Sequence, residues 1–278
     1  MSSANVAKGV AAANGAMELS DGTFVRVEGA GPAAIFLHGI GLDHSIFAGQ
    51  VSAFRHSMTT VAYDIVGHGR SRKPQVEHSI SLYLDQLCLV MDELSLDRPI
   101  LVGFSLGSLI ARAFAIRYPE RLAGLALMNT WFQRTPKETR KVLSRLSQAA
   151  TAGPAVSVAP ALERWFSEAY RVSSPESLKN IADILKANDH HSFISAYAIV
   201  AAQGTPEVDE VDRITCPTIV ITGQEDRGNS PGMSMRVSEN IEGSDLVILP
   251  GLRHMALVED AAVVNATLAR LFRRVAVG

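Results

Sequence analysis

The chain has 278 residues, of which 47% are hydrophobic and 19% are charged, and its formal net charge is −2. A chain of this length and composition can bury a large core, so we expect a globular protein with one domain or one domain carrying an insertion. The small net charge and the lack of a dense basic run argue against nucleic acid as a partner. No apolar stretch approaches the roughly 20 residues that span a bilayer, so we expect no membrane association.

The beginning of the chain is small and weakly polar, without the basic start and continuous apolar stretch of a secretion signal. We interpret residues 1–16 as a disordered tail. The two cysteines, Cys88 and Cys216, make neither a disulfide framework nor a metal cluster, which favours a reducing compartment. The expected location is the cytoplasm.

Residues 17–130 alternate between short β-rich runs and helical patterns. The expected strands are 23–29, 33–39, 58–64, 99–104 and 122–130, and helices are expected at 44–54 and 80–94. Such alternation is typical of a doubly wound α/β fold, in which helices cover both faces of a mostly parallel sheet.

The alternation stops at Trp131. Only helical patterns follow, at 136–150, 155–170, 175–189 and 192–203. Strands return at 216–223 and 244–251, and a helix at 260–275 closes the chain. We therefore predict a core made of residues 17–130 and 211–278, into which an all-helical cap of residues 131–210 is inserted.

The stretch "PILVGFSLGSLIARAF" joins an expected strand to an expected helix with only a serine at the turn. Gly103 and Gly107 flank Ser105 at two residues on either side, which permits a very tight reversal with a strained central residue. The hydroxyl of Ser105 would then lie beside the first free N–H groups of a helix. This arrangement makes Ser105 a candidate nucleophile.

A serine nucleophile needs a base, and the base needs an orienting acid. Ligands of a parallel α/β sheet collect at the carboxyl ends of its strands, so these partners should directly follow strands. Asp226 follows the run "CPTIVITG" and His254 follows "SDLVILPG". Glu225 is the alternative acid, although a position one residue earlier would direct it elsewhere.

The oxyanion that forms on attack needs two hydrogen-bond donors. The N–H of Leu106, directly after the nucleophile, is the first candidate. The second is the N–H of Ile40, in the loop "HGIG", where two glycines let the backbone curl. His38, which begins this loop, is interpreted as structural.

The chain resembles the α/β-hydrolase fold superfamily in five motifs in family order: "HGIG" from His38, "DIVGHGRS" from Asp64, "GFSLG" from Gly103, "GQED" ending at Asp226 and "GLRH" ending at His254. The resemblance implies a nucleophile at Ser105, a general base and acid at His254, an orienting acid at Asp226, oxyanion donors at Ile40 and Leu106, and no cofactor.

The same resemblance makes Asp64 and His68 elements of the fold rather than catalysts. A serine nucleophile argues against the haloalkane dehalogenase and epoxide hydrolase branches, which attack through a carboxylate. The family often has a proline four residues after the acid, whereas Pro231 lies five after Asp226, which implies a one-residue insertion in this loop.

Within the superfamily, the cap sequence looks most like 3-oxoadipate enol-lactonases and related hydrolases of aromatic and heterocycle catabolism. Five aromatic residues either line a small apolar pocket or pack between the cap and the sheet: Trp131, Phe132, Trp165, Phe166 and Tyr170. Arg134 or Arg164 either receives a substrate carboxylate or lies on a solvated helix face.

The leading hypothesis is a cofactor-independent hydrolase that cleaves a small ester, lactone or amide through an acyl-enzyme. One alternative is hydrolysis of a carbon–carbon bond in a vinylogous diketone, and another is a ligand receptor with vestigial hydrolysis. A non-catalytic scaffold is disfavoured because all three triad candidates are present. No metal site is expected, since His190 and His191 are adjacent rather than four residues apart. The sequence does not define an oligomeric state.

Overall fold

A computed structural model describes residues 14–202 and 206–277. Its centre is a sheet of eight strands in the order β1-β2-β4-β3-β5-β6-β7-β8. The strands are β1 (Gly15–Glu18), β2 (Phe24–Glu28), β3 (Ala33–Leu37), β4 (Thr59–Tyr63), β5 (Ile100–Phe104), β6 (Gly124–Met128), β7 (Thr218–Gly223) and β8 (Asp245–Leu249). All neighbouring pairs from β4 to β8 in this order are parallel, and β2 is antiparallel to both β1 and β4. The predicted mostly parallel α/β sheet is confirmed.

Strand β1 differs from the expectation for the start of the chain. It begins at Gly15, inside the range expected to be a tail, and pairs residue by residue with β2 from Gly15↔Val27 to Glu18↔Phe24. Four residues without an apolar alternation carry too weak a pattern to be recognised as a strand. Residues 1–13 of the expected tail lie outside the described residues.

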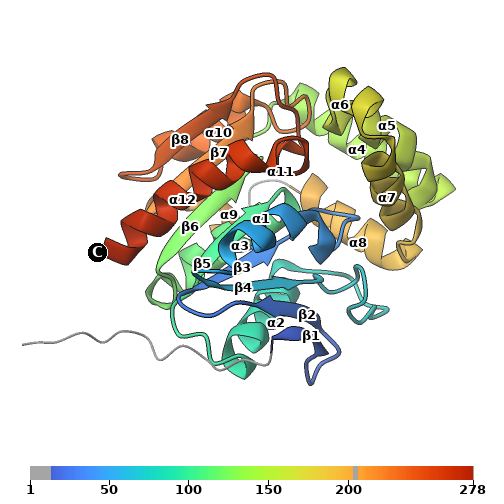
Figure 1. Ribbon diagram of the computed structural model, residues 1–278. Coiled ribbons are helices and arrows are strands. Elements are labelled where there is room, and N and C mark those ends of the chain that lie inside the picture. The colour runs from blue at the N-terminus through green and yellow to red at the C-terminus, as the bar shows by residue number, and fades with distance from the viewer. Residues whose placement is uncertain (1–13, 203–205, 278) are drawn as a thin grey trace, which may run out of the picture.

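Helices cover both faces of the sheet (Figure 1). The core helices are α1 (Ala48–Phe54), α2 (Ile80–Glu93), α3 (Leu106–Arg117), α10 (Pro231–Glu239), α11 (Ala256–Glu259) and α12 (Ala261–Val277). Alternate residues of β3 point to opposite faces: Ile35 and Leu37 belong to the apolar cluster that contains α2 and α3, whereas Ala34 and Phe36 belong to the cluster that contains α1 and α12. This two-sided burial explains why the central strands are continuous apolar runs.

The segment after β6 forms a group of helices at one side of the sheet (Figure 1). These cap helices are α4 (Pro136–Ala152), α5 (Val158–Trp165), α6 (Glu168–Ser173), α7 (Pro175–Lys186) and α8 (His190–Ala201), and a short α9 (Pro206–Asp209) follows them. Thr135 and Glu138 form a capping box at the start of α4.

One expected cap helix, 155–170, is divided in the structure. A 3₁₀ turn at Pro154–Ser157 precedes α5, and the chain becomes extended at Phe166 before α6 begins. Ser167 starts the new helix by accepting a hydrogen bond from the N–H of Tyr170. The interruption places the end of α5 beside the loop that carries His254, as described below.

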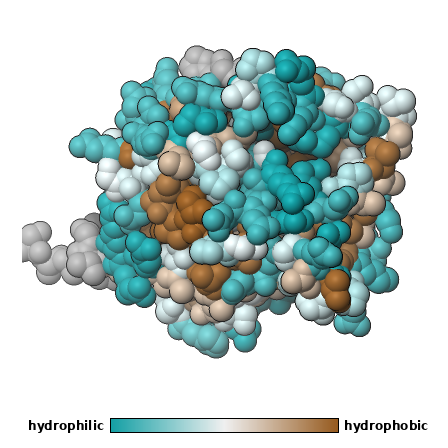
Figure 2. All heavy atoms as spheres, turned by 90° about the horizontal axis from the view of Figure 1, so that it is seen from above, coloured by the Kyte–Doolittle hydropathy of each residue, from teal (hydrophilic) through white to brown (hydrophobic). Residues whose placement is uncertain are grey.

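The surface seen from above mixes hydrophilic and hydrophobic residues, and the brown apolar residues occur in separate groups (Figure 2). In the described part of the chain, no helix is both long and apolar enough to cross a membrane.

Candidate active site

Ser105 lies alone between the last residue of β5 and the first residue of α3. Its backbone has φ 52° and ψ −113°, an unfavourable conformation for a residue with a side chain, which costs about 1–3 kcal/mol. The turn is held in place because the N–H of Ser105 donates to the carbonyl oxygen of Met128 on neighbouring β6, at 3.0 Å. The expected tight turn is therefore present, and Ser105 is 6% exposed.

The glycines around Ser105 are required by close backbone contacts. A Cβ atom at Gly103 would lie 2.3 Å from the carbonyl oxygen of Gly107, and one at Gly107 would lie 2.0 Å from the carbonyl oxygen of Leu37. The N–H of Gly107 donates to the carbonyl oxygen of His38 at 2.9 Å. The start of α3 is thus packed directly against the end of β3, which brings the Ser105 turn beside the "HGIG" loop.

Asp226 and His254 come from the loops after β7 and β8 and form a buried pair. The Nδ1 atom of His254 lies 2.6 Å from Oδ2 of Asp226. Oδ2 also accepts the side-chain amide of Asn129 at 2.8 Å, and Oδ1 accepts the N–H groups of Gly228 and Asn229 at 2.8 and 3.0 Å. The carboxylate of Asp226 is therefore fixed in position by four donors, one of which is the base candidate.

The pKa of Asp226 is set by two opposing effects. Burial raises it, but the charge and hydrogen bond of His254 and the hydrogen bonds from Asn129 and Asn229 lower it more, so that the net pKa lies below the ordinary value. Asp226 is consequently an acceptor-only carboxylate at neutral pH, and Nδ1 of His254 is the donor. This tautomer leaves Nε2 of His254 free to accept a proton.

The alternative acid, Glu225, points elsewhere. Its side chain is 49% exposed, and Oε2 lies 3.6 Å from Nε of Arg253. Pro231 is the first residue of α10 and ends the loop after β7. The structure brings Asp226, and not Glu225, to His254.

Two backbone N–H groups are available beside Ser105. Neither the N–H of Leu106 nor that of Ile40 donates a hydrogen bond to another of the described residues. Both lie next to Ser105, because Leu106 follows it in the chain and Ile40 lines the same cavity. These are the two donors expected for an oxyanion.

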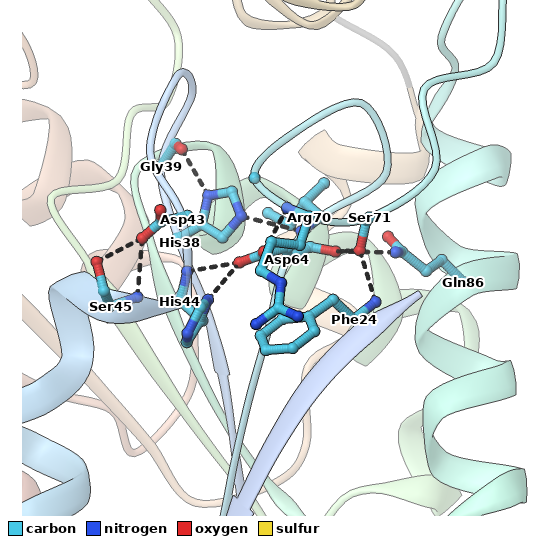
Figure 3. A network of polar contacts seen from close by, with 12 residues as sticks. Phe24, His38, Gly39, Asp43, His44, Ser45, Asp64, Arg70, Ser71 and Gln86 are labelled. Carbon is cyan, nitrogen blue, oxygen red and sulfur yellow. Dashed lines mark hydrogen bonds and ion pairs between the residues drawn. The ribbon is translucent and has the colours of Figure 1, made fainter. Parts of the chain in front are cut away.

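His38 holds the loop that contains Ile40. Its Nε2 accepts the N–H of Ile65 at 2.9 Å, so Nδ1 carries the proton and donates to the carbonyl oxygen of Gly39 at 2.8 Å (Figure 3). The ring is fully buried, and burial lowers its pKa, which keeps it neutral. The geometry agrees with a structural role for His38.

Asp64 is the centre of a second polar network (Figure 3). Its carboxylate accepts the N–H of His44 at 2.8 Å, Nδ1 of His44 at 2.7 Å and the N–H of Arg70 at 2.7 Å. Side-chain atoms of Asp43, His44 and Asp64 lie close enough together to share a metal ion. Since the carboxylate of Asp64 is already occupied by these three donors, the network is sufficiently explained as a support for the loop.

Ser105 and His254 line one narrow cavity of about 60 Å³ beneath the cap. Trp165 lies on its wall, with its ring centroid 5.8 Å from that of His254, and Phe104 packs on His254 at 4.9 Å. The remaining walls combine polar side chains with apolar ones, and the apolar residues include Val142, Ala161, Leu185, Phe193 and Val200. No hydrogen bond joins Ser105 to Nε2 of His254 in the described chain. Catalytic hydrogen bonds of this kind are often long without substrate and shorten when the substrate binds.

The aromatic residues expected in this pocket are divided between different environments. Only Trp165 lines the cavity with Ser105. Trp131 and Phe132 line a second cavity of about 430 Å³, in which the Phe132 ring faces the guanidinium of Arg112 of α3 and the Trp131 ring faces that of Arg134. Phe166 is buried and stacks on Tyr170 at 5.2 Å, so these two rings pack the junction of α5 and α6.

Polar residues of the site were missed by the sequence reasoning. Asn129 binds Asp226 and directly follows β6, so its position at a strand end was a usable signal. Asn229 donates to the carbonyl oxygen of Asn129 at 2.6 Å. Arg145 lines the cavity from the middle of α4, three residues after the buried Val142 and four before the buried Ala149, so this spacing was a usable signal that the exposed Arg140 lacks.

The loop of His254 is bonded to the cap. Arg253 donates through Nη1 to the carbonyl oxygens of Glu163 and Phe166, both at 2.9 Å, and the N–H of Met255 donates to the carbonyl oxygen of Trp165 at 3.0 Å. Glu259 accepts the N–H of Arg253 at 3.0 Å through one oxygen and the N–H of Ser167 at 2.7 Å through the other. We call residues 163–167 and 253–259 the cap clamp.

Comparison with known proteins agrees with this geometry. The family model of the alpha/beta hydrolase fold matches residues 32–261, and the chain belongs to this family. The crystal structure of the enol-lactonase from Burkholderia xenovorans LB400 superimposes with a TM-score of 0.83 at 27% identity, covering 93% of this chain and 99% of that one.

Two relatives from Acinetobacter baylyi match over most of their length. The 3-oxoadipate enol-lactonase 2 is 25% identical over 87% of this chain and 89% of its own, and the (E)-2-((N-methylformamido)methylene)succinate hydrolase is 23% identical over 87% and 90%. The predicted family is confirmed, and so is the prediction that the chain is a hydrolase.

Proposed function

We propose that this hydrolase cleaves a small ester or lactone through a covalent acyl-enzyme on Ser105, without a cofactor. The proposal rests on one observation: the carboxyl ends of three strands come together beside one cavity. The strained Ser105 after β5, Asp226 after β7 and His254 after β8 are arranged so that Nδ1 of His254 is bound to the acid and its Nε2 is free.

In the proposed reaction, Nε2 of His254 takes the proton of Ser105 and the serine oxygen attacks the carbonyl carbon. The N–H groups of Ile40 and Leu106 stabilise the resulting oxyanion. His254 then gives its proton to the leaving oxygen, which for a lactone remains part of the same molecule. Water, deprotonated by His254, attacks the acyl-enzyme and regenerates the Ser105 hydroxyl.

Two known relatives support a lactone or ester as substrate. The enol-lactonase structure covers nearly the whole fold, and the 3-oxoadipate enol-lactonase 2 matches through core and cap alike. The same triad chemistry serves hydrolysis of a carbon–carbon bond, so the substrate panel has to include a vinylogous diketone.

The first experiment treats the wild type and Ser105→Ala with a fluorophosphonate and compares intact masses. We expect one adduct on the wild type and none on the variant, because the reagent reports an activated serine without knowledge of the substrate. Turnover of lactones, esters and a diketone by the untreated wild type then assigns the bond that is broken. A folded wild type that takes no adduct and turns over no compound would overturn the proposal in favour of a ligand receptor.

A further inference from the structure

Three arginine side chains line the cavity that contains Ser105 and His254: Arg134, Arg145 and Arg164. They come from the loop before α4, from α4 and from α5, so three separate parts of the cap contribute a positive charge to this cavity, and Arg134 also lines the neighbouring cavity of Trp131. No Asp or Glu is among the described residues that line the cavity. Within the described chain, none of the three forms an ion pair with a carboxylate.

Arg134 is the most deeply buried of the three, with 9% of its surface exposed. Its Nη1 donates to the carbonyl oxygen of Val200 at 2.6 Å, its guanidinium lies 4.4 Å from the ring centroid of Trp131, and its Nε is buried without a partner among the described residues. Burial, together with the charges of Arg145 and Arg112, lowers its pKa to about 9. Arg134 is therefore still a cation at neutral pH, and its buried Nε–H lacks a hydrogen-bond acceptor among the described residues.

Arg145 lies within electrostatic range of both other arginines. Burial lowers the pKa of Arg164, and the charge of Arg145 lowers it further, as it also does for Arg134. Each guanidinium has five N–H donors. Arg145 donates to the hydroxyl of Tyr197 at 3.0 Å and Arg164 to the carbonyl oxygen of Pro160 at 3.2 Å, which leaves most of their donors without a protein acceptor among the described residues.

The charge of Glu138 acts on Arg134 and that of Asp226 on Arg164, but neither carboxylate forms an ion pair with these side chains. Partly buried like charges without a direct ion pair destabilise the folded chain unless an anion compensates them. We propose that the cavity binds a substrate that carries a free carboxylate, and that the three arginines form its carboxylate subsite. The inference rests on the proposed function, because the carboxylate and the carbonyl group that Ser105 attacks belong to one substrate molecule. Planar guanidinium groups bind carboxylates through paired hydrogen bonds.

The rest of the cavity fits a short hydrocarbon chain between the carboxylate and the reacting carbonyl. Leu185, Phe193 and Trp165 provide apolar surface in the same cavity as the arginines and Ser105. The substrate class is thus a small ester or lactone of an acid that keeps a second, ionised carboxyl group.

The test measures the rate of fluorophosphonate labelling of Ser105 in the presence of possible occupants. Succinate and adipate are compared with the neutral succinamide and adipamide, and with inorganic phosphate, at millimolar concentrations and constant ionic strength. We expect the two acids to slow labelling by about tenfold or more and the amides to have little effect, because only the acids bring a charge to the arginines. Arg145→Gln and Arg164→Gln should lose this protection, whereas Arg140→Gln, on the exposed face of α4, should keep it.

The outcomes separate this inference from the proposed function. Labelling that no acid slows would overturn the carboxylate subsite while leaving the nucleophile in place. Protection by phosphate but by neither carboxylate would overturn it too. If Ser105 takes no label and no compound is turned over, the proposed function fails. Whenever Ser105 takes no label, isothermal titration of the same acids tests the anion site independently: binding that is weakened in Arg145→Gln supports the site, and no binding contradicts it.

Discussion

The indole ring of Trp165 lies beside the imidazole ring of His254, with the two planes 29° apart and the ring centroids separated by 5.8 Å. Trp165 ends a cap helix and His254 follows the last strand of the core, so the contact joins segments about ninety residues apart in the chain. The hydrogen bonds of the cap clamp surround this contact. The cap therefore takes part in orienting His254, the proposed base, and does not only cover the cavity.

Glu259 is the acid of the cap clamp, and Glu259→Gln tests its contribution. One carboxylate oxygen faces the N–H of Arg253 and the other the N–H of Ser167, so an amide places a donor against one of these two donors. We expect kcat to fall about tenfold with a smaller change in KM, because the position of His254 is disturbed more than binding. Glu239→Gln, at an exposed position of α10, is the control. Equal kcat values for the two variants would contradict a positioning role.

Asp226→Asn and Glu225→Gln form a matched pair for the orienting acid. The Asp226→Asn change presents an amide to His254 and removes the charge that stabilises the imidazolium, so we expect kcat to fall by about 10⁴-fold. Glu225→Gln should change kcat by less than about threefold, since this side chain is half exposed and contacts Arg253. Steady-state kinetics on the best ester from the substrate panel measure both, and comparable losses would reopen the assignment of the acid.

Gly107→Ala and Gly232→Ala compare two helical glycines. At Gly107 the new methyl group would lie 2.0 Å from the carbonyl oxygen of Leu37, so the start of α3 must move away from β3. We expect the free energy of unfolding to decrease by about 2 kcal/mol or more. At Gly232, in the first turn of α10, the nearest atom is 3.8 Å away, and alanine should stabilise by about 0.4–1 kcal/mol. Urea denaturation followed by circular dichroism gives both values.

His68 should make the protein less stable in acid. The ring is fully buried, and burial, followed by the charge of His38, lowers its pKa from 6.5 to about 3. Between these two pH values the unfolded chain binds the proton and the folded chain does not, so the free energy of unfolding falls as the pH decreases. One such group gives a slope of about 1.4 kcal/mol per pH unit, and burial of His38 acts in the same direction.

His68→Phe keeps a buried ring and removes the titration. Unfolding measured between pH 6.5 and 4.5 should then show a slope smaller by up to about 1.4 kcal/mol per pH unit than in the wild type. His56→Gln, at an exposed position, is the control. An unchanged slope in His68→Phe would mean that His68 is not the group responsible.

The sheet and the polar residues at its strand ends could be predicted because their signals are local. A buried strand such as 100–104 has a continuous apolar run, and the tight turn at Ser105 has its glycines within two residues. Asp226 and His254 follow strands directly, and a parallel sheet brings such positions to one edge. Strand β1 escaped recognition since its stability comes from pairing with β2 and not from its own pattern.

The cavity could not be predicted, because it depends on how the cap helices pack. Arg145 and Arg140 lie in the same helix, yet only Arg145 lines the cavity. Phe166 and Trp165 are adjacent, but the end of α5 directs one ring to His254 and the other into the core. Side-chain direction at a helix end is decided by tertiary contacts such as those of Arg253, which no local pattern contains.

At Ser105 the strained backbone lowers the stability of the fold, while the side chain that causes the strain carries the hydroxyl proposed to react. Glycine adopts a φ of 52° without steric cost, so Ser105→Gly would relieve strain while it removes the hydroxyl. Any residue able to attack a carbonyl carries a side chain, and therefore the strain. Under the proposed function, variants selected for heat resistance alone would gain glycine at position 105 and lose the reaction, so selection for activity would be needed to keep the serine there.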